Sequence, residues 1–259
     1  MLLCLDIGNT HIFGGVLIGE EIKLHFRYAS TQEGTSDQLG LFLKNVLREN
    51  AIDPNEIKQI SLCSVVPALD YSVTSACIKY FGVEPFLLRP GVKTGLKILL
   101  NNPTEVGADR IANVIAAEHY FPNKNILVLD FGTATTCSAI SAQKEYLGGV
   151  IMPGLKIAMH ALHSNANKLF PVEIVKPDAT LGKTTKQNMQ SGVYYGHLGA
   201  IKEIIKNLTL EAFAQKPPVI IGTGGFVHLF KEEQIFAAVI PDLILQGLRL
   251  VLEKNSNRQ

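Results

Sequence analysis

The sequence predicts an α/β protein built from two similar halves, each a mixed β-sheet flanked by helices. The main observation is a repeated pattern in which an apolar strand ends in Asp and is followed by Gly and small polar residues. It occurs at Asp6 and again at Asp130, 124 residues apart in a chain of 259. The second observation is that the order of predicted strands and helices also repeats in kind along the chain.

The first half begins with a predicted β-hairpin. Apolar runs at 2–7 and 12–18 flank a polar loop at 8–11, and its Gly-Asn-Thr residues are typical of turns. Thr35 and Gln38 have the spacing of a capping box at the start of a helix. The other elements expected here are a strand at 22–29, a helix ending near Glu49, a strand at 58–66, a helix at 68–81 and a strand at 84–89.

The second half follows a turn-rich stretch at 90–107, which indicates a long functional loop. We expect the chain to divide into an N-terminal half at 1–117 and a C-terminal half at 118–259. The predicted helices are 109–121, about 155–168, 186–213 and 242–253, and the predicted strands are 126–131, 135–141, 145–149 and 219–225.

Composition excludes several classes of function. A net charge of +1 with scattered Lys and Arg gives no electrostatic basis for binding nucleic acid or an anionic membrane. The apolar runs have the length of strands, and the N-terminus lacks the pattern of a secretory leader. We therefore expect a cytoplasmic protein. Its four cysteines form no CxxC pair, so we expect them to be reduced and mostly buried.

The repeated strand ends are suited to binding phosphate. Small residues after Asp6 and Asp130 let backbone N–H groups approach an anion closely, and hydroxyl and amide side chains add donors. The two aspartates would repel phosphate unless they hold a cation or its waters. A simpler interpretation is that these residues only form hairpin turns. Two copies at matching strand ends favour phosphate binding.

A third glycine cluster follows the strand near 219–221, at Gly222-Thr223-Gly224-Gly225. It could lie under an adenosine, or it could be a plain turn between a strand and a helix. It lacks the last Gly of a dinucleotide fingerprint. A P-loop is also excluded, because the Gly expected five residues before Gly182 is Pro177.

The segment Gly107-Ala108-Asp109-Arg110 lies at the start of the helix predicted at 109–121. The helix dipole favours a carboxylate there, and Asp109 could accept a hydroxyl proton as a general base. Arg110 could bind a carboxylate or phosphate with two parallel bonds. The alternative is an ordinary N-terminal carboxylate beside a surface arginine.

The sequence resembles the type III pantothenate kinases over essentially the whole chain. Five segments in this order carry the resemblance: DIGNT (6–10), GADR (107–110), DFGTATT (130–136), GVIMPG (149–154) and GTGG (222–225). The resemblance implies a duplicated actin-like (ribonuclease H-like) fold, with two mixed-sheet domains flanked by helices and a nucleotide cleft between them. It implies that ATP phosphorylates pantothenate to 4′-phosphopantothenate, the first step of coenzyme A biosynthesis.

The resemblance also implies roles for single residues. Asp109 would be the catalytic base. Asp130 would hold a monovalent cation, K+ or NH4+, and Asp6 would hold Mg2+ through water. A homodimer is implied as well. The residues implied to bind ATP are Asp6, Ile7, Gly8, Asn9, Thr10, His11, Ile12, Phe13 and Thr133, and those implied to bind pantothenate are Gly107, Ala108, Asp109, Arg110 and Thr185.

One position departs from the family pattern. Many relatives have an aromatic residue three positions before the Pro of the Asn-Pro step, and here Leu100 stands before Pro103. Leu100 offers no phenol hydroxyl to the substrate. Two alternative functions stay open: a kinase of the same superfamily acting on a sugar or acetate, and a non-catalytic regulator that binds nucleotide.

Overall fold

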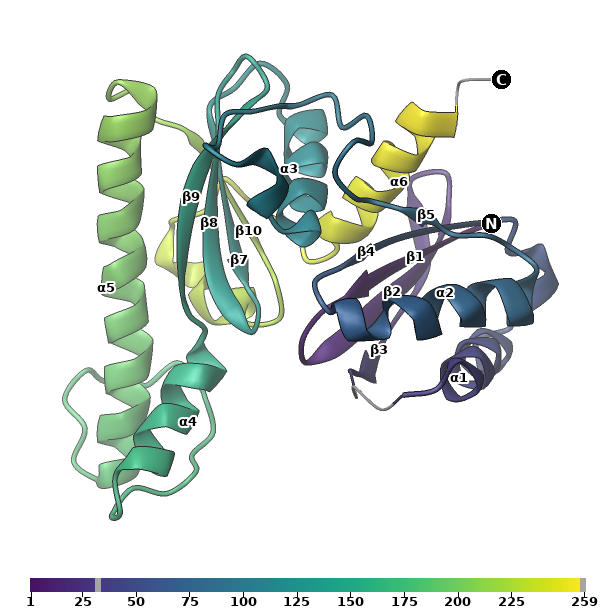
Figure 1. Cartoon of the computed structure of the whole chain (residues 1–259). Helices are drawn as coiled ribbons and strands as arrows, with labels where there is room; N and C mark the ends of the chain where they lie inside the picture. Colours follow the sequence, from purple (N-terminus) through teal and green to yellow (C-terminus); the bar gives the residue numbers. More distant parts are fainter. Residues whose placement is uncertain (31–33, 257–259) are drawn as a thin grey trace. The chain divides into compact units, whose positions relative to one another are not determined.

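The chain forms two compact units in the computed structural model, which describes residues 1–30 and 34–256 (Figure 1). The first unit comprises Met1–Leu96, Asn101–Ala116 and Leu243–Gln259, and the second comprises Lys97–Leu100 and Ala117–Asp242. Each unit is described by itself below.

The sheet of the first unit has the strand order β3-β2-β1-β4-β5. β1 pairs antiparallel with β2 and parallel with β4, so it lies at the centre of the sheet. β2 pairs antiparallel with β3, and β4 pairs parallel with β5. The strands are β1 (Leu2–Ile7), β2 (His11–Ile18), β3 (Glu21–Ala29), β4 (Gln59–Ser64) and β5 (Phe86–Leu87).

The sheet of the second unit repeats this plan. Its order is β11-β10-β7-β8-β9-β6, so β7, β8, β9, β10 and β11 occupy the places of β1 to β5. The pairing directions also match, which confirms the predicted duplication. The strands are β6 (Lys97–Ile98), β7 (Ile126–Phe131), β8 (Ala134–Ile140), β9 (Glu145–Pro153), β10 (Val219–Thr223) and β11 (Ala238–Val239).

The strands of the first unit follow from their residue patterns. β1 is apolar at almost every position and is buried on both faces, as expected of a central strand. β3 alternates exposed and partly buried side chains, which suits an edge strand with one face to solvent. The capping box that begins α1 (Ser36–Glu49) is present between Thr35 and Gln38, as predicted.

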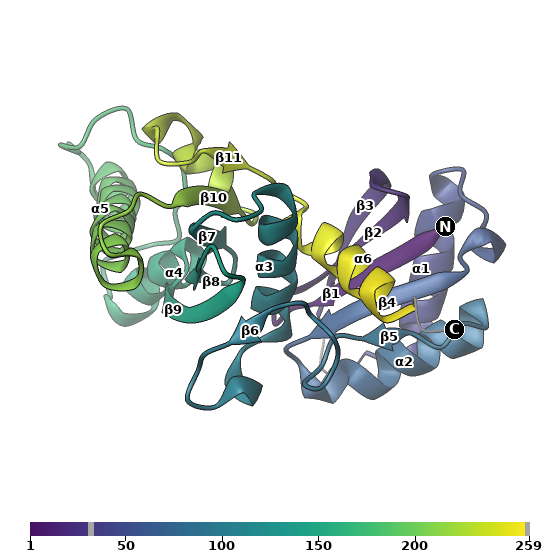
Figure 2. The ribbon, with the colours of Figure 1, turned by 90° about the horizontal axis from the view of Figure 1, so that it is seen from above.

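Helices cover both faces of the first sheet (Figure 2). α1 and α2 (Pro67–Phe81) pack on the face that carries Leu3, Leu5 and Ile7. The opposite face meets α6 (Leu243–Ser256), where a side chain on Gly15 would collide with Leu245 and the Ser61 hydroxyl donates to the Leu248 carbonyl at 2.8 Å. Strand alternation explains this division, because successive side chains point to opposite faces.

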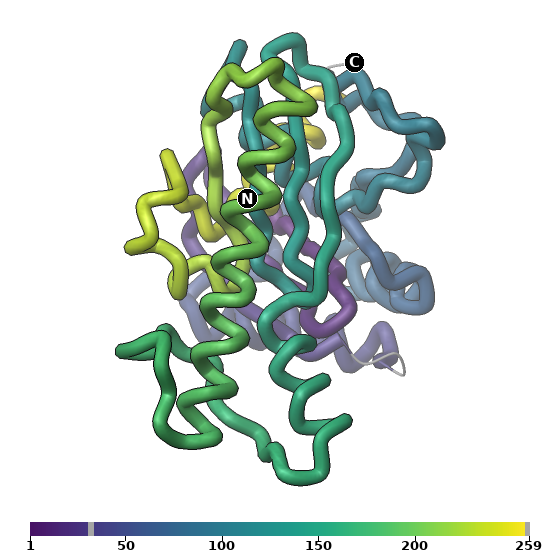
Figure 3. The backbone as a smooth tube through the Cα atoms, turned by 90° about the vertical axis from the view of Figure 1, so that its left-hand side faces the viewer, coloured from purple at the N-terminus to yellow at the C-terminus, as the bar shows by residue number. Residues whose placement is uncertain are grey.

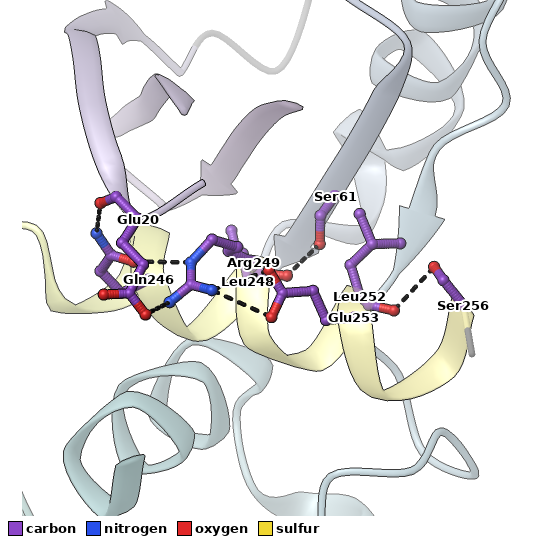
Figure 4. A network of polar contacts seen from close by, with 8 residues as sticks. All are labelled: Glu20, Ser61, Gln246, Leu248, Arg249, Leu252, Glu253 and Ser256. Atoms are coloured by element: carbon purple, nitrogen blue, oxygen red, sulfur yellow. Dashed lines mark hydrogen bonds and ion pairs between the residues drawn. The ribbon is translucent and has the colours of Figure 1, made fainter. Parts of the chain in front are cut away.

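A buried arginine of α6 forms hydrogen bonds that link this helix to the turn between β2 and β3 (Figure 4). The Arg249 side chain is only 6% exposed and donates to Glu253 at 2.8 Å, to Glu20 at 3.2 Å and to Gln246 at 3.0 Å. Gln246 in turn donates to the Glu20 carbonyl. Every donor of such a buried charge needs a partner, and these three side chains provide them.

The second unit has its core between the sheet and α5 (Thr185–Phe213), beside which α4 (Leu155–Asn165) lies near one end (Figure 3). Apolar residues of β7 and β8 pack against Val193, Tyr194, Leu198 and Ile201, which form an apolar stripe on α5. The 3-10 helix η3 (Val227–Glu233) closes this core with Phe230.

The structure differs from the sequence prediction in several details. β9 continues through the Gly/Pro segment to Pro153 instead of ending at 149, because it pairs with β8 along that length. The two-residue strands β6 and β11 were not predicted, and such short runs give no periodic signal. The C-terminal helix, assigned to the half at 118–259, belongs to the first unit because its apolar face packs on β1 and β4.

The remaining helices are α3 (Ala108–Tyr120) and the 3-10 turns η1 (Pro54–Glu56) and η2 (Pro103–Glu105). None of the helices in the described part of the chain combines the length and apolarity that crossing a bilayer requires. The four cysteines are buried and form no disulfide, as predicted.

Candidate active site

The first hairpin ends in a tight, braced loop. Asp6 pairs with Phe13 and Ile7 with Ile12 across the β1–β2 ladder, and the Gly8 N–H donates to the His11 carbonyl at 3.1 Å. The neighbouring strand β3 supports the loop through Ser30. The Ser30 hydroxyl donates to the Gly8 carbonyl at 2.6 Å and its N–H donates to the Thr10 carbonyl at 3.0 Å.

The eight residues predicted to bind ATP on this hairpin fall into two groups. Ile7, Ile12 and Phe13 are buried, so their side chains build the core and only their backbone can face a ligand. Asp6 and the loop residues are accessible and carry the polar groups suited to phosphate or its metal. These loop residues are Gly8, Asn9, Thr10 and His11.

Asp6 is held by a side chain of the neighbouring parallel strand. In the β1–β4 ladder Asp6 is paired with Cys63, and the Cys63 thiol donates to the Asp6 carboxylate at 3.4 Å. Burial, and then the charges of Asp6 and Asp109, raise the pKa of the Cys63 thiol well above its usual value. Cys63 therefore stays protonated and can act as a donor.

Asp109 lies in the first turn of α3, at the edge where β1 and β4 end. Gly107 lies close beside it, because a side-chain carbon at 107 would displace the end of the Asp109 carboxylate. Burial raises the pKa of Asp109, against the opposing influence of the Arg110 N–H and guanidinium. The structure thus brings Asp6, Cys63 and Asp109 near one another within the first unit, where both carboxylates act on a neutral thiol.

The second hairpin has the same plan with a shorter loop. Asp130 pairs with Thr136 and Phe131 with Thr135, and the Gly132 N–H donates to the Ala134 carbonyl at 3.1 Å. Thr133, predicted to contact ATP, is exposed at the tip of this loop.

Glycine backbones pack directly against this second loop. A side chain on Gly154 would collide with the Thr133 and Gly132 carbonyls. One on Gly224 would collide with the Asp130 carboxylate and the Phe131 backbone, and Gly224 has φ +89, which glycine adopts readily. The cluster at 222–225 therefore lies beside Asp130. Its predicted contact with adenosine stays a prediction.

Thr185 lies apart from the second hairpin. It is exposed at the first position of α5, after Thr184, whose side chain accepts the Gln187 N–H as an N-cap. His197, which contacts the hairpin at Thr135, is twelve residues further along the helix. Thr185 and His197 are therefore about 18 Å apart along the helix axis. The second unit alone does not bring Thr185 to its hairpin.

The donor set suits a hydrated divalent metal better than a caged one. Within residues 1–30 and 34–256, no group of three or more His, Cys, Asp and Glu side chains could hold a metal ion. Mg2+ usually keeps several waters and binds one or two carboxylates together with substrate phosphates. The accessible Asp6 carboxylate beside the phosphate-type loop fits that mode.

Comparison with known proteins identifies the family. Residues 2–207 match the family described as Type III pantothenate kinase. The chain belongs to the type III pantothenate kinases. It is therefore a kinase, with ATP as the phosphoryl donor, pantothenate as the acceptor and a divalent metal as the usual companion of ATP.

Named relatives support membership of this pantothenate kinase family along the whole chain. A type III pantothenate kinase of Legionella pneumophila (strain Corby) is 56% identical over 256 residues, covering 99% of this chain and all of that protein. One from Elusimicrobium minutum (strain Pei191) is 47% identical over 255 residues, covering 98% of this chain and 99% of the other.

Solved structures show that this kinase has the actin-like fold. A Baf family protein of Campylobacter jejuni has a TM-score of 0.63 at 21% identity, covering 98% of this chain and 99% of its own. Component A of the (R)-2-hydroxyglutaryl-CoA dehydratase of Acidaminococcus fermentans has a TM-score of 0.56 at 11% identity, covering 99% of both chains. At these identities the likeness concerns the fold alone.

Two residues of this pantothenate kinase were missed by sequence reasoning. Cys63 was assigned only as a buried thiol, yet the ladder register places it against Asp6. His197 interrupts the apolar stripe of α5 and bonds to the second hairpin. A polar residue inside an apolar helical stripe was the available signal for His197, whereas Cys63 needed the strand register.

Proposed function

We propose that Asp109 is the general base with which this kinase phosphorylates the primary hydroxyl of pantothenate. The observation that carries the proposal is the placement of Asp109, a partly buried carboxylate with a raised pKa close to Cys63, the residue that bonds to Asp6. A base poised nearer the working pH accepts a proton more effectively than an ordinary aspartate.

The proposed reaction balances as follows. The hydroxyl oxygen of pantothenate forms a bond to the γ-phosphorus of ATP, and the bond between that phosphorus and the bridging oxygen of ADP breaks. The hydroxyl proton passes to the Asp109 carboxylate. Because phosphoryl transfer has a loose transition state, positioning and charge neutralisation should contribute more than basicity.

We assign the remaining groups by the chemistry they offer. Arg110, next to Asp109, can bind the carboxylate of pantothenate. The backbone N–H groups of the first loop and Thr133 of the second would contact ATP. Asp6 would hold Mg2+ through water, and Mg2+ would offset phosphate charge. Asp130 would hold K+ or NH4+.

Leu100 and Thr185 are the two remaining positions that bear on how pantothenate binds. Leu100 lies 3.6 Å from the position of a side-chain carbon built on Gly148, so it packs over β9 instead of offering a hydroxyl. Thr185 is exposed at the start of α5, where a second copy of the chain could approach it. We therefore keep the homodimer as part of the proposal. Sedimentation of a monomer under assay conditions would contradict it.

The experiment that tests the proposal is ATP-dependent phosphorylation of pantothenate, measured in potassium and in sodium at equal ionic strength. We expect turnover that depends on potassium, and we expect the Asp130→Asn variant to lose the difference between the two salts. Turnover that is indifferent to the cation would keep the kinase and remove the cation site at Asp130. ATP binding without any turnover would contradict the kinase and favour a regulator or another acceptor.

A further inference from the structure

A buried polar pair joins α5 to the second hairpin. The His197 ring nitrogen Nε2 lies 2.9 Å from the Thr135 hydroxyl. Both residues are almost completely buried, at 5% and 2% exposure. The contact links residues 62 positions apart in the sequence, one on a helix and one on a strand.

Thr135 is the second residue of β8, which begins at Ala134, and it belongs to the last ladder pair before the loop. It pairs with Phe131 across β7 and β8, and only Gly132, Thr133 and Ala134 separate the two. A shift of the Thr135 side chain is therefore transmitted to the loop within two residues, and Thr133 at the loop tip is the residue proposed to contact ATP.

Backbone groups of other segments also support this hairpin. Gly154 and Gly224 approach so closely that neither position has room for a side chain. The Phe226 N–H donates to the Phe131 carbonyl at 3.2 Å. His197 adds a side-chain bond on the face of the hairpin that packs against α5.

The His197 ring has a fixed orientation. It stacks on Phe230 with the ring centres 5.9 Å apart and the planes 22° apart, and it lies 6.3 Å from the Phe131 ring. Burial lowers the pKa of His197, which keeps the imidazole neutral, with one nitrogen donating and one accepting. A buried polar atom needs a hydrogen-bond partner, and the Thr135 hydroxyl and the Nε2 atom of His197 provide one for each other.

We propose that His197 is a positioning residue that fixes the β7–β8 hairpin for the phosphates of ATP through the Thr135 hydroxyl. The proposal rests on the proposed contact of Thr133 with ATP. Removing the bond should free the Thr135 side chain and lower ATP affinity. The chemistry of transfer should stay the same once ATP is bound.

The test compares variants that remove the bond with a control that removes a bond from the same core. His197→Phe keeps an aromatic ring but removes the nitrogen, and Thr135→Val keeps the shape but removes the hydroxyl. His197→Gln and Thr135→Ser retain hydrogen-bonding groups. The control is Tyr194→Phe, since Tyr194 stacks on the same Phe230 at 5.1 Å and bonds to Glu233 at 2.8 Å, away from the hairpin.

ATP affinity is measured by calorimetry, with KM for ATP, kcat with pantothenate and the melting temperature of each variant. A bond of ordinary strength predicts about fivefold weaker ATP binding in His197→Phe and Thr135→Val, with kcat within about twofold of the parent. The double variant His197→Phe with Thr135→Val should bind ATP no more weakly than the single variant of lower affinity, because both changes remove the same bond. Thr135→Ser should bind ATP with the affinity of the parent. Tyr194→Phe should lower the melting temperature and leave ATP affinity unchanged.

Two results would overturn the proposal. In one, both bond-removing variants bind ATP as the parent does. In the other, Tyr194→Phe lowers the melting temperature as much as the bond-removing variants do and also weakens ATP binding as much. That result would make His197 an ordinary core residue. Because calorimetry with ATP needs no acceptor, failure of pantothenate turnover in the parent chain would contradict the proposed function while leaving this comparison readable.

Discussion

The two hairpins share one plan, but different groups lie against their loops. Each joins the central strand of its sheet to an antiparallel neighbour, and each has an aspartate at the end of the central strand. In the first, side chains brace the loop: the Ser30 hydroxyl bonds to Gly8 and the Cys63 thiol to Asp6. In the second, the backbones of Gly154 and Gly224 lie directly against the loop.

The position paired with each aspartate on the parallel strand shows most clearly how the surroundings of the two aspartates differ. The residue that pairs with Asp6 on the parallel strand is Cys63, and the one that pairs with Asp130 is Thr223. Cys63 donates to its aspartate, whereas the Thr223 hydroxyl donates to the Pro241 carbonyl and Gly224 approaches Asp130. The fold thus fixes where the aspartates lie, while local residues decide what surrounds them. The first hairpin should be sensitive to loss of the Ser30 or Cys63 group. The second should be sensitive to an added carbon at Gly154 or Gly224, in addition to loss of the His197–Thr135 bond.

Among changes within the two hairpins, those at Asp6 and Asp130 should give the largest effects and should differ in kind. Asp6→Asn removes the charge proposed to hold Mg2+, so kcat should fall by about 100-fold or more and the Mg2+ requirement should rise. Asp130→Asn should instead abolish stimulation by potassium. Turnover measured across Mg2+ and K+ concentrations separates them. The same ion dependence in both variants would break the comparison.

Adding one carbon to the second hairpin should have the next largest effect. The methyl group of Gly154→Ala would collide with two carbonyls of the loop, and such overpacking costs about 1–3 kcal/mol. We expect ATP affinity to fall by about 10- to 100-fold. The control is Gly196→Ala on α5, where an added carbon meets nothing within 4 Å. Equal ATP affinity in both variants would contradict the close packing at 154.

Acid should inhibit through Asp109. Burial raises the pKa of Asp109 above the ordinary value of 3.8, and a general base works only as the carboxylate. As pH falls through this raised pKa, the carboxylate is lost, so kcat/KM should drop about tenfold per pH unit. A pH profile of kcat/KM checks this. A flat profile down to pH 4 would contradict the raised pKa.

Removing the Ser30 hydroxyl should have the smallest effect of the set. Ser30→Ala deletes the bond to the Gly8 carbonyl, which is worth about 1 kcal/mol or roughly fivefold in KM for ATP. Ser61→Ala is the matched control, because its hydroxyl bonds to the Leu248 carbonyl of α6 in the same unit. KM for ATP should rise in Ser30→Ala and stay constant in Ser61→Ala. The reverse result would remove Ser30 from the support of the loop.

Sequence reasoning found what periodicity and motif spacing encode. The repeated strand-Asp-Gly pattern predicted the duplication, and Thr35 with Gln38 predicted the start of α1. It could not find pairings between distant segments. The contacts of Cys63 with Asp6, of His197 with Thr135 and of α6 with the first sheet all depend on strand register or packing. The pairing of Cys63 and the packing of α6 leave no local signal in the chain, and the polar break at His197 does not identify its partner.

The most direct test of the account is the Asp109→Asn variant, measured for pantothenate phosphorylation and for ATP binding in the same preparation. The account predicts that turnover falls by about 100- to 10,000-fold while ATP binds with the affinity of the parent, because Asp109 serves the acceptor and both hairpins are intact. Turnover close to that of the parent, or loss of ATP binding, would contradict the assignment of Asp109 as the base.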